Sequence, residues 1–171
     1  MNTALQPRNA AALILLASAA TVGGAFAFQH LGGYAPCILC WWQRYAHFAV
    51  IGFALLALLP LGPAIRMGLL FCAGAAALTG TGIAVFHVGV EQHWWQGTAE
   101  CGSTLGPAGS IEELRQRLLM QPVVRCDEVA WSLFGVSMAG YNALISLGLA
   151  VLAFVSAWQG LQRRTVGTRP A

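Results

Sequence analysis

Four long apolar stretches constrain the fold of this chain more than any other feature. They cover residues 10–28, 41–59, 67–86 and 139–158, and Arg44 is the only charged residue within them. At about 1.5 Å per helical residue, each stretch is long enough to cross the roughly 30 Å of a bilayer's hydrocarbon core. The stretches are apolar on all sides and lack the alternation of barrel strands. We therefore predict an all-α membrane protein, with residues 1–171 forming one four-helix transmembrane bundle.

The composition agrees with a membrane location. Of the 171 residues, 57% are hydrophobic and only 9% are charged, whereas soluble domains carry about 25% charged residues. The basic residues are all arginines, and they are scattered along the chain. This distribution excludes the clustered basic patch of a nucleic-acid-binding protein.

The positions of the arginines predict an orientation. Five of them flank the apolar stretches on one face: Arg8, Arg66, Arg163, Arg164 and Arg169. The connections on the opposite face are residues 29–40 and 87–138, and the longer one carries six acidic residues against three arginines. Because cytoplasmic segments are enriched in arginine, we expect both termini in the cytoplasm and both of these connections outside it.

Five cysteines form a second pattern. Cys37 and Cys40 stand two residues apart where the second stretch begins, and Cys101 and Cys126 lie in the long connection. Thiols in an oxidising compartment tend to pair, and four cysteines can pair in three ways. Cys37–Cys40 together with Cys101–Cys126 is the simplest of these. Cys72 lies within the third stretch, where a cysteine packs as a small hydrophobic residue.

The spacing of Cys37 and Cys40 favours redox chemistry. At the start of a helix, both sulfurs lie near unpaired backbone N–H groups and the positive end of the helix dipole, which favours the thiolate. Arg44 follows Cys40 by one turn and shares its helix face, where it could stabilise a thiolate or a reduced, anionic acceptor. The alternative is that Arg44 only extends its charge to the bilayer surface.

Two other interpretations of the cysteines are structural. A zinc site needs converging ligands, but Cys101 and Cys126 are 25 residues apart and none of the four histidines has ligand spacing with a cysteine. Inert disulfides are the second alternative, although closing a loop as short as that between Cys37 and Cys40 removes little chain entropy. We therefore expect a redox role for the short pair and no bound metal.

Further polar residues suggest local roles. Ser110 and Glu113 form a capping box before leucines at helical spacing, which predicts a short amphipathic helix in the long connection. This helix would lie either on the bilayer surface or on the end of the bundle. His87 ends the third stretch and is either a ligand contact or a solvated boundary residue. Asn142, in the last stretch, is more typical of a hydrogen bond between helices.

The combined pattern resembles the DsbB family of bacterial disulfide bond formation proteins over nearly the whole chain. His87 stands where family members have a histidine near the quinone. Gln43 stands where some members have a glutamate, so this chain lacks that carboxylate. The other matching residues are Pro36-Cys37-Ile38-Leu39-Cys40 with Arg44, Cys101-Gly102, and Cys126-Asp127 ahead of Trp131, Phe134 and Gly135.

The resemblance implies a quinone-dependent thiol oxidase of the bacterial inner membrane. Its partner would be a reduced, DsbA-like periplasmic protein that attacks the Cys101–Cys126 disulfide at Cys101. Cys126 would then attack Cys37, and Cys40 would pass the electrons to ubiquinone, with menaquinone as the alternative. Arg44 and His87 would bind that quinone. The lipid bilayer is the remaining partner, and no nucleic acid is involved.

Two alternatives of function stay open. Vitamin K epoxide reductase-like enzymes also combine four helices, dithiols and a quinone, but their C-x-x-C lies on a later helix, after the loop pair. A non-enzymatic membrane scaffold with structural disulfides would retain the cysteines and reduce no quinone.

Overall fold

The computed structural model describes residues 6–101, 110–112, 115 and 124–167. Over these residues the long elements are four helices: α1 (Pro7–His30), α2 (Ile38–Leu58), α3 (Pro63–Glu91) and α5 (Met138–Gly167). Three short elements lie between α3 and α5, namely the 3-10 helix η2 (Ala99–Cys101) and the strands β1 (Ser132–Leu133) and β2 (Val136–Ser137). The predicted helical bundle thus carries a two-stranded antiparallel ladder that the sequence did not suggest.

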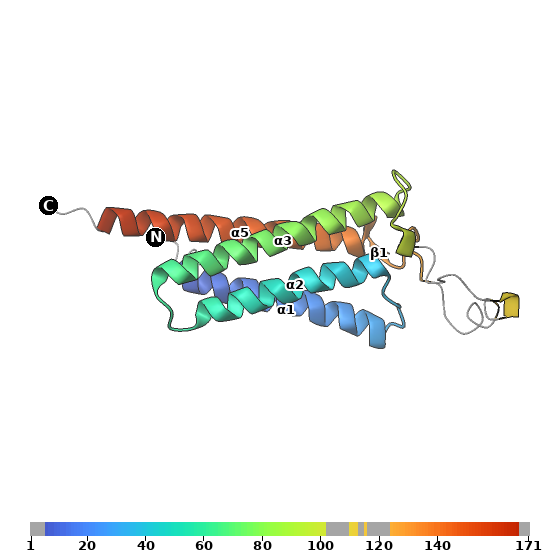
Figure 1. Ribbon diagram of the computed structural model, residues 1–171, viewed down its shortest axis with the longest axis horizontal. Helices are drawn as coiled ribbons and strands as arrows, with labels where there is room; N and C mark the ends of the chain where they lie inside the picture. The colour runs from blue at the N-terminus through green and yellow to red at the C-terminus, as the bar shows by residue number, and fades with distance from the viewer. Residues whose placement is uncertain (1–5, 102–109, 113–114, 116–123, 168–171) are drawn as a thin grey trace.

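The four helices lie side by side along one axis (Figure 1). Helix α1 packs against α2 and α5, and α3 packs against the same two helices, so the bundle has the cyclic order α1–α2–α3–α5. The chain termini lie at one end of the bundle, whereas η2 and β1 lie at the other (Figure 1). We call the second end the cysteine end, because it holds Cys37, Cys101 and Cys126.

Within the described residues, three of the four predicted spans are confirmed as helices that are long and apolar enough to cross a membrane. They are α1, α3 and residues 138–163 of α5. The second predicted span is α2, whose 21 residues would cover about 31 Å. Gln43, Arg44 and His47 lower the mean hydropathy of its first half, so its crossing of a bilayer stays a prediction.

Helices α1, α3 and α5 extend beyond the predicted spans at both ends, and α2 extends beyond its span at the start. Helix α2 begins at Ile38 with Cys37 as its N-cap, and α3 extends from Pro63 to Glu91. Pro63 occupies the first turn, where its missing N–H leaves no hydrogen bond unmade. The predicted stretch ended at Phe86, before His87, but the helix continues to Glu91, whose carboxylate accepts a hydrogen bond from Ser137. The prediction therefore ended the helix five residues early.

The interior of the bundle is built from small side chains. Its main core cluster consists largely of alanines, and the larger members of the cluster are Ile14, Val50, Leu70 and Leu149. Larger apolar side chains point outward along the helices, including Leu16, Leu55, Phe71, Leu78 and Leu144. Small interior residues let helices approach closely, and large exterior ones suit contact with lipid. This arrangement supports the interpretation of the chain as a membrane protein.

Two glycines shape the cysteine end. Phe134 and Gly135 connect β1 to β2 with φ angles of 50° and 79°, a left-handed turn that glycine adopts without strain. On α3, a Cβ at Gly89 would come within 2.0 Å of the Trp95 ring. The ring packs in that space, and its Nε1 donates to the Phe86 carbonyl oxygen at 2.9 Å.

The amphipathic helix predicted in the long connection falls largely outside the described residues. Only Ser110, Ile111, Glu112 and Arg115 of that segment are described. Arg115 and Glu112 form an exposed ion pair at 4.0 Å. The amphipathic helix therefore stays a prediction.

Candidate functional site

Cys37 and Cys40 occupy the first turn of α2, as the sequence predicted. Cys37 caps the helix, because its sulfur accepts a hydrogen bond from the backbone N–H of Cys40 at 3.3 Å. The two sulfurs lie 2.8 Å apart, and both cysteines are free. A hydrogen bond with Cys40, together with burial, raises the pKa of the Cys37 thiol. Cys37 is therefore the member of the pair that keeps its proton, and its bond to Cys40 favours the thiolate at Cys40.

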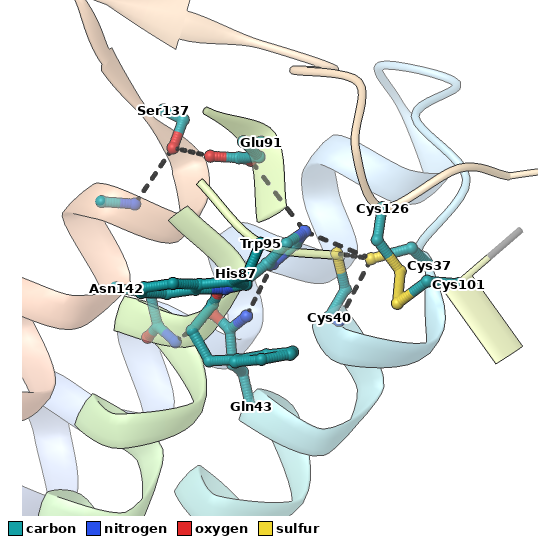
Figure 2. Close-up of polar contacts among 12 residues, drawn as sticks. Cys37, Cys40, Gln43, His87, Glu91, Trp95, Cys101, Cys126, Ser137 and Asn142 are labelled. Carbon is teal, nitrogen blue, oxygen red and sulfur yellow. Dashed lines mark hydrogen bonds and ion pairs between the residues drawn. A yellow bond between two sulfur atoms is a disulfide. The ribbon is translucent and has the colours of Figure 1, made fainter. Parts of the chain in front are cut away.

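Cys101 and Cys126 form a disulfide with a Cα–Cα distance of 5.1 Å. Together with Cys37, Leu39 and Val90, they make up a buried cluster at the cysteine end. Figure 2 shows the disulfide directly beside Cys37. The fold therefore brings a disulfide from the long connection against the dithiol at the start of α2.

Next to the dithiol is a cavity of about 400 Å³. Its wall is mostly apolar, with contributions from Ala20, Val22, Ala25, Phe28 and Ile145, among others. Cys40, Arg44 and His87 also line it. The volume and the mixture of an apolar wall with a few polar groups are typical of a site for a small organic ligand.

Arg44 lies on the wall of this cavity and is only 7% exposed. Its guanidinium donates to Gln29 Oε1 at 2.6 Å and to the Ala25 carbonyl oxygen at 3.1 Å. It also lies 4.7 Å and 4.9 Å from the ring centroids of Phe26 and Trp41. In the described part of the chain, no carboxylate pairs with Arg44. Its positive charge therefore remains available to the Cys40 sulfur and to a ligand in the cavity.

His87, on α3, lies beside Cys37. Its Nε2 is 3.6 Å from the Cys37 sulfur and 4.0 Å from Oε1 of Glu91 (Figure 2). On the other side of the ring, Nδ1 is 2.9 Å from Nε2 of Gln43. The sequence predicted His87 at the depth of Arg44, and both do line the same cavity. The contact of His87 with a cysteine was not foreseen.

Sequence reasoning missed several polar residues of the site. Gln43, His47 and Glu91 are all buried and line the cavity, and Asn142 lines it too. The sequence did contain a signal for Gln43 and His47. His47 follows Cys40 and Arg44 at helical spacing on one face of α2, and Gln43 lies beside that face. Asn142 does form hydrogen bonds between helices, to Gln43 and His47, as predicted.

A second cavity, of about 710 Å³, lies beside the disulfide. Cys101 lines it together with Trp94, Trp95, Arg125 and Asp127, but Cys126 does not. Cys126 is completely buried, whereas Cys101 retains 6% exposure. Of the two disulfide sulfurs, the one that an external reactant can approach is therefore that of Cys101.

The geometry also bears on the zinc alternative. Contrary to the sequence-based reasoning, one histidine does lie near the short pair: ligand atoms of Cys37, Cys40 and His87 are all within 4.8 Å of one another. Two thiolates bound to one tetrahedral zinc at about 2.3 Å would stand roughly 3.8 Å apart. The two sulfurs are only 2.8 Å apart, which fits a disulfide-forming pair better than a zinc site.

Comparisons with known proteins agree with this geometry. The family model for disulfide bond formation protein DsbB matches residues 7–156. Disulfide bond formation protein B of Verminephrobacter eiseniae is 34% identical over 161 residues, covering 88% of this chain and 86% of that protein. Its counterpart in Stutzerimonas stutzeri is 30% identical over 167 residues, covering 92% of this chain and 96% of that protein. No solved structure matches the chain significantly. Since the family model spans most of the sequence, this chain belongs to the DsbB family of disulfide bond formation proteins.

Proposed function

We propose that this chain is a quinone-dependent thiol oxidase that re-oxidises a DsbA-like periplasmic protein and so supports disulfide bond formation. The observation that carries the proposal is the contact between the Cys101–Cys126 disulfide and the Cys37–Cys40 pair beside a cavity that also holds Arg44. Two dithiol/disulfide pairs in contact can exchange electrons by thiolate attack on a disulfide.

The outer pair receives electrons from the partner. A thiolate of the reduced partner attacks the Cys101 sulfur through the second cavity, forming a mixed disulfide and releasing the Cys126 thiolate. The partner's second thiolate then breaks the mixed disulfide and leaves as the oxidised protein. The different exposures of Cys101 and Cys126 support this order, because Cys126 cannot be reached from outside.

The inner pair passes the electrons on. The Cys126 thiolate attacks Cys37 when Cys37 and Cys40 are joined in a disulfide, and Cys40 leaves as a thiolate. Arg44 and the N-terminus of α2 stabilise that thiolate. Re-formation of the Cys101–Cys126 disulfide then returns Cys37 as a thiol next to Cys40, which is the arrangement of the structure.

The residues around the first cavity fit a quinone head group. Its apolar wall suits the ring, and the Arg44 guanidinium and a ring N–H of His87 could donate to the carbonyl oxygens. A buried guanidinium without a counterion is costly near a bilayer, and a reduced, anionic ligand would offset that cost. A quinone supplies the oxidant: it takes up the two electrons and two protons that the partner's two thiols lose. We assign this role to ubiquinone, with menaquinone as the alternative.

A direct assay tests the proposal. The purified chain is mixed with reduced DsbA and a soluble ubiquinone analogue, and quinone absorbance is followed. We expect catalytic loss of quinone matched by oxidation of DsbA. Cys72→Ser is the matched control, since Cys72 is the remaining cysteine and lies away from both pairs. A chain that reduces no quinone would instead support the scaffold alternative.

The order of exchange has its own test. A reduced partner whose second cysteine is replaced by serine can attack the Cys101–Cys126 disulfide but cannot leave by closing its own disulfide, so a mixed disulfide with the partner should accumulate at Cys101. Mass spectrometry of the crosslinked peptide identifies the cysteine. A crosslink at Cys37 would contradict the order, and would favour direct reaction of the partner with the inner pair.

A further inference from the structure

A continuous network of buried and part-buried hydrogen bonds links Cys37 to the middle of the bundle. It runs from Cys37 to His87 and then to Gln43 and Asn142 (Figure 2). From Asn142 it continues to Nε2 of His47 at 2.8 Å, and His47 Nδ1 ends it at Ser18 Oγ, also at 2.8 Å. The network involves all four helices, and nothing in the proposed electron transfer uses its inner half.

The contacts have one consistent direction. The amide nitrogen of Asn142 donates to Gln43 Oε1, which leaves Gln43 Nε2 to donate to His87 Nδ1. Asn142 Oδ1 accepts from Ser146 Oγ and faces His47 Nε2, so that nitrogen carries a proton and Ser18 donates to His47 Nδ1. With Nδ1 of His87 accepting, its proton is on Nε2. That nitrogen faces the Cys37 sulfur at 3.6 Å.

We propose that His47 and Asn142 are positioning residues, which act through Gln43 to hold the proton of His87 on Nε2, directed at the Cys37 sulfur. The inference rests on the proposed function, in which Cys37 carries negative charge each time its disulfide is exchanged. A hydrogen bond to the thiolate stabilises it relative to the thiol. The same bond would be lost if His87 adopted the other tautomer, because a lone pair would then face the sulfur.

Other ionisable groups also act on Cys37 and have to be held constant in any test. On α2 the nearest is Cys40, and on α3 the carboxylate of Glu91 lies beside His87. From α2 and the segment before β1, three more charged residues line the same cavity: Arg44, Arg125 and Glu128. None of them contacts His47 or Asn142 among the hydrogen bonds of the described residues. Substitutions at these two positions therefore leave the charges around Cys37 unchanged.

The test measures how readily Cys37 ionises. In a Cys40→Ser background, the rate of Cys37 alkylation by iodoacetamide is followed against pH, and peptide mass spectrometry separates Cys37 from Cys72 and detects any exchange with the disulfide. We expect Asn142→Leu and His47→Leu each to move the midpoint upward by about half a pH unit. His47→Gln, which keeps an N–H donor, should bring the midpoint most of the way back to its value in the Cys40→Ser chain.

Two comparisons separate positioning from packing. Thr81→Val is the matched control, since it removes a buried hydroxyl that bonds only within α3, and its midpoint should not move. In a His87→Leu background, Asn142→Leu should cause no further shift. If Asn142→Leu lowers the unfolding temperature but leaves the midpoint unmoved, the hydrogen-bond network only joins the helices and does not position His87. If Asn142→Leu does not fold, Ser18→Ala opens the far end of the network and should give a smaller shift of the same sign.

The alkylation experiment needs neither a partner protein nor a quinone. A failed quinone assay with a shifted midpoint would remove the proposed function and leave the positioning role intact. An active enzyme with an unmoved midpoint would overturn the positioning role alone.

Discussion

Arg44 combines burial with a charge that its hydrogen-bond partners do not neutralise. It is buried, and its hydrogen-bond partners Gln29 and Ala25 are neutral acceptors. Two aromatic rings cover its guanidinium. Because neutral partners do not cancel the charge, the guanidinium would attract a ligand that carries partial negative charge.

Replacing Arg44 by glutamine should weaken quinone binding. We expect the apparent KM for quinone to rise about tenfold or more, since a hydrogen bond from a charged group contributes roughly 1.5–3 kcal/mol. Steady-state quinone reduction at saturating DsbA measures it. The matched control is Arg66→Gln, because Arg66 bonds only to carbonyl oxygens at the far end of α2. An unchanged KM in Arg44→Gln would reduce Arg44 to an interfacial charge.

Cys40 should control the ionisation of Cys37. The hydrogen bond with Cys40 is the largest cause of the raised pKa of Cys37, and burial is the next. Cys40→Ser removes the thiolate that receives this bond, so the pKa of Cys37 should fall and its alkylation should begin at lower pH. The comparison is with the reduced wild-type chain, and Cys72→Ser should behave like wild type. A midpoint that stays the same or rises would contradict the assigned hydrogen bond.

At the scale of elements, the sequence predicted the helices better than their ends. Long apolar runs determine that a helix forms, but its ends depend on partners distant in sequence. Glu91 is an example, since the buried carboxylate at the end of α3 accepts a hydrogen bond from Ser137, which lies 46 residues further along the chain. The cysteines and Arg44 could be selected as site candidates from local spacing. The spacing of Gln43 and His47 along α2 places them near Cys40 and Arg44, but the sequence does not show their hydrogen bonds, because the partners Asn142 and Ser18 lie on other helices.

Helix α3 offers a matched pair of glycines for testing how Trp95 is held. A methyl group at Gly89 would overlap the Trp95 ring, whereas nothing lies within 4 Å of one at Gly82. Gly89→Ala should lower stability by about 1–3 kcal/mol through overpacking. Gly82→Ala should raise it by up to about 1 kcal/mol through helix propensity. Thermal unfolding in detergent measures both, and equal effects would show that Trp95 moves aside freely.

The whole molecule has its small residues inside and its large apolar residues outside, which is the reverse of a soluble bundle. This pattern places the bundle in a bilayer but does not give its direction. The direction is inferred from arginine placement, and we propose that the cysteine end faces the periplasm of a bacterial inner membrane, with both termini in the cytoplasm.

Labelling of intact spheroplasts tests the orientation of the bundle in the membrane. In a Cys72→Ser background, single cysteines are introduced at Phe134, which is 92% exposed at the cysteine end, and at Gly62, in the exposed turn between α2 and α3. A thiol reagent that does not cross membranes should label Phe134→Cys in intact spheroplasts and Gly62→Cys only after lysis. The opposite pattern would invert the topology.

The two cavities have different linings, and Arg125 is the only described residue that lines both. Cys101 faces one cavity, and the Cys37–Cys40 pair faces the other. In the proposed function, the sulfur atoms of the two cysteine pairs would therefore connect the two cavities. If the proposed function holds, the partner protein at Cys101 and the quinone beside Cys40 would occupy different cavities, so the reduced partner could not pass its electrons to the quinone directly. In that case the electrons would have to pass through the two cysteine pairs, and the exchange between Cys126 and Cys37 would be the step at which the transfer could be stopped.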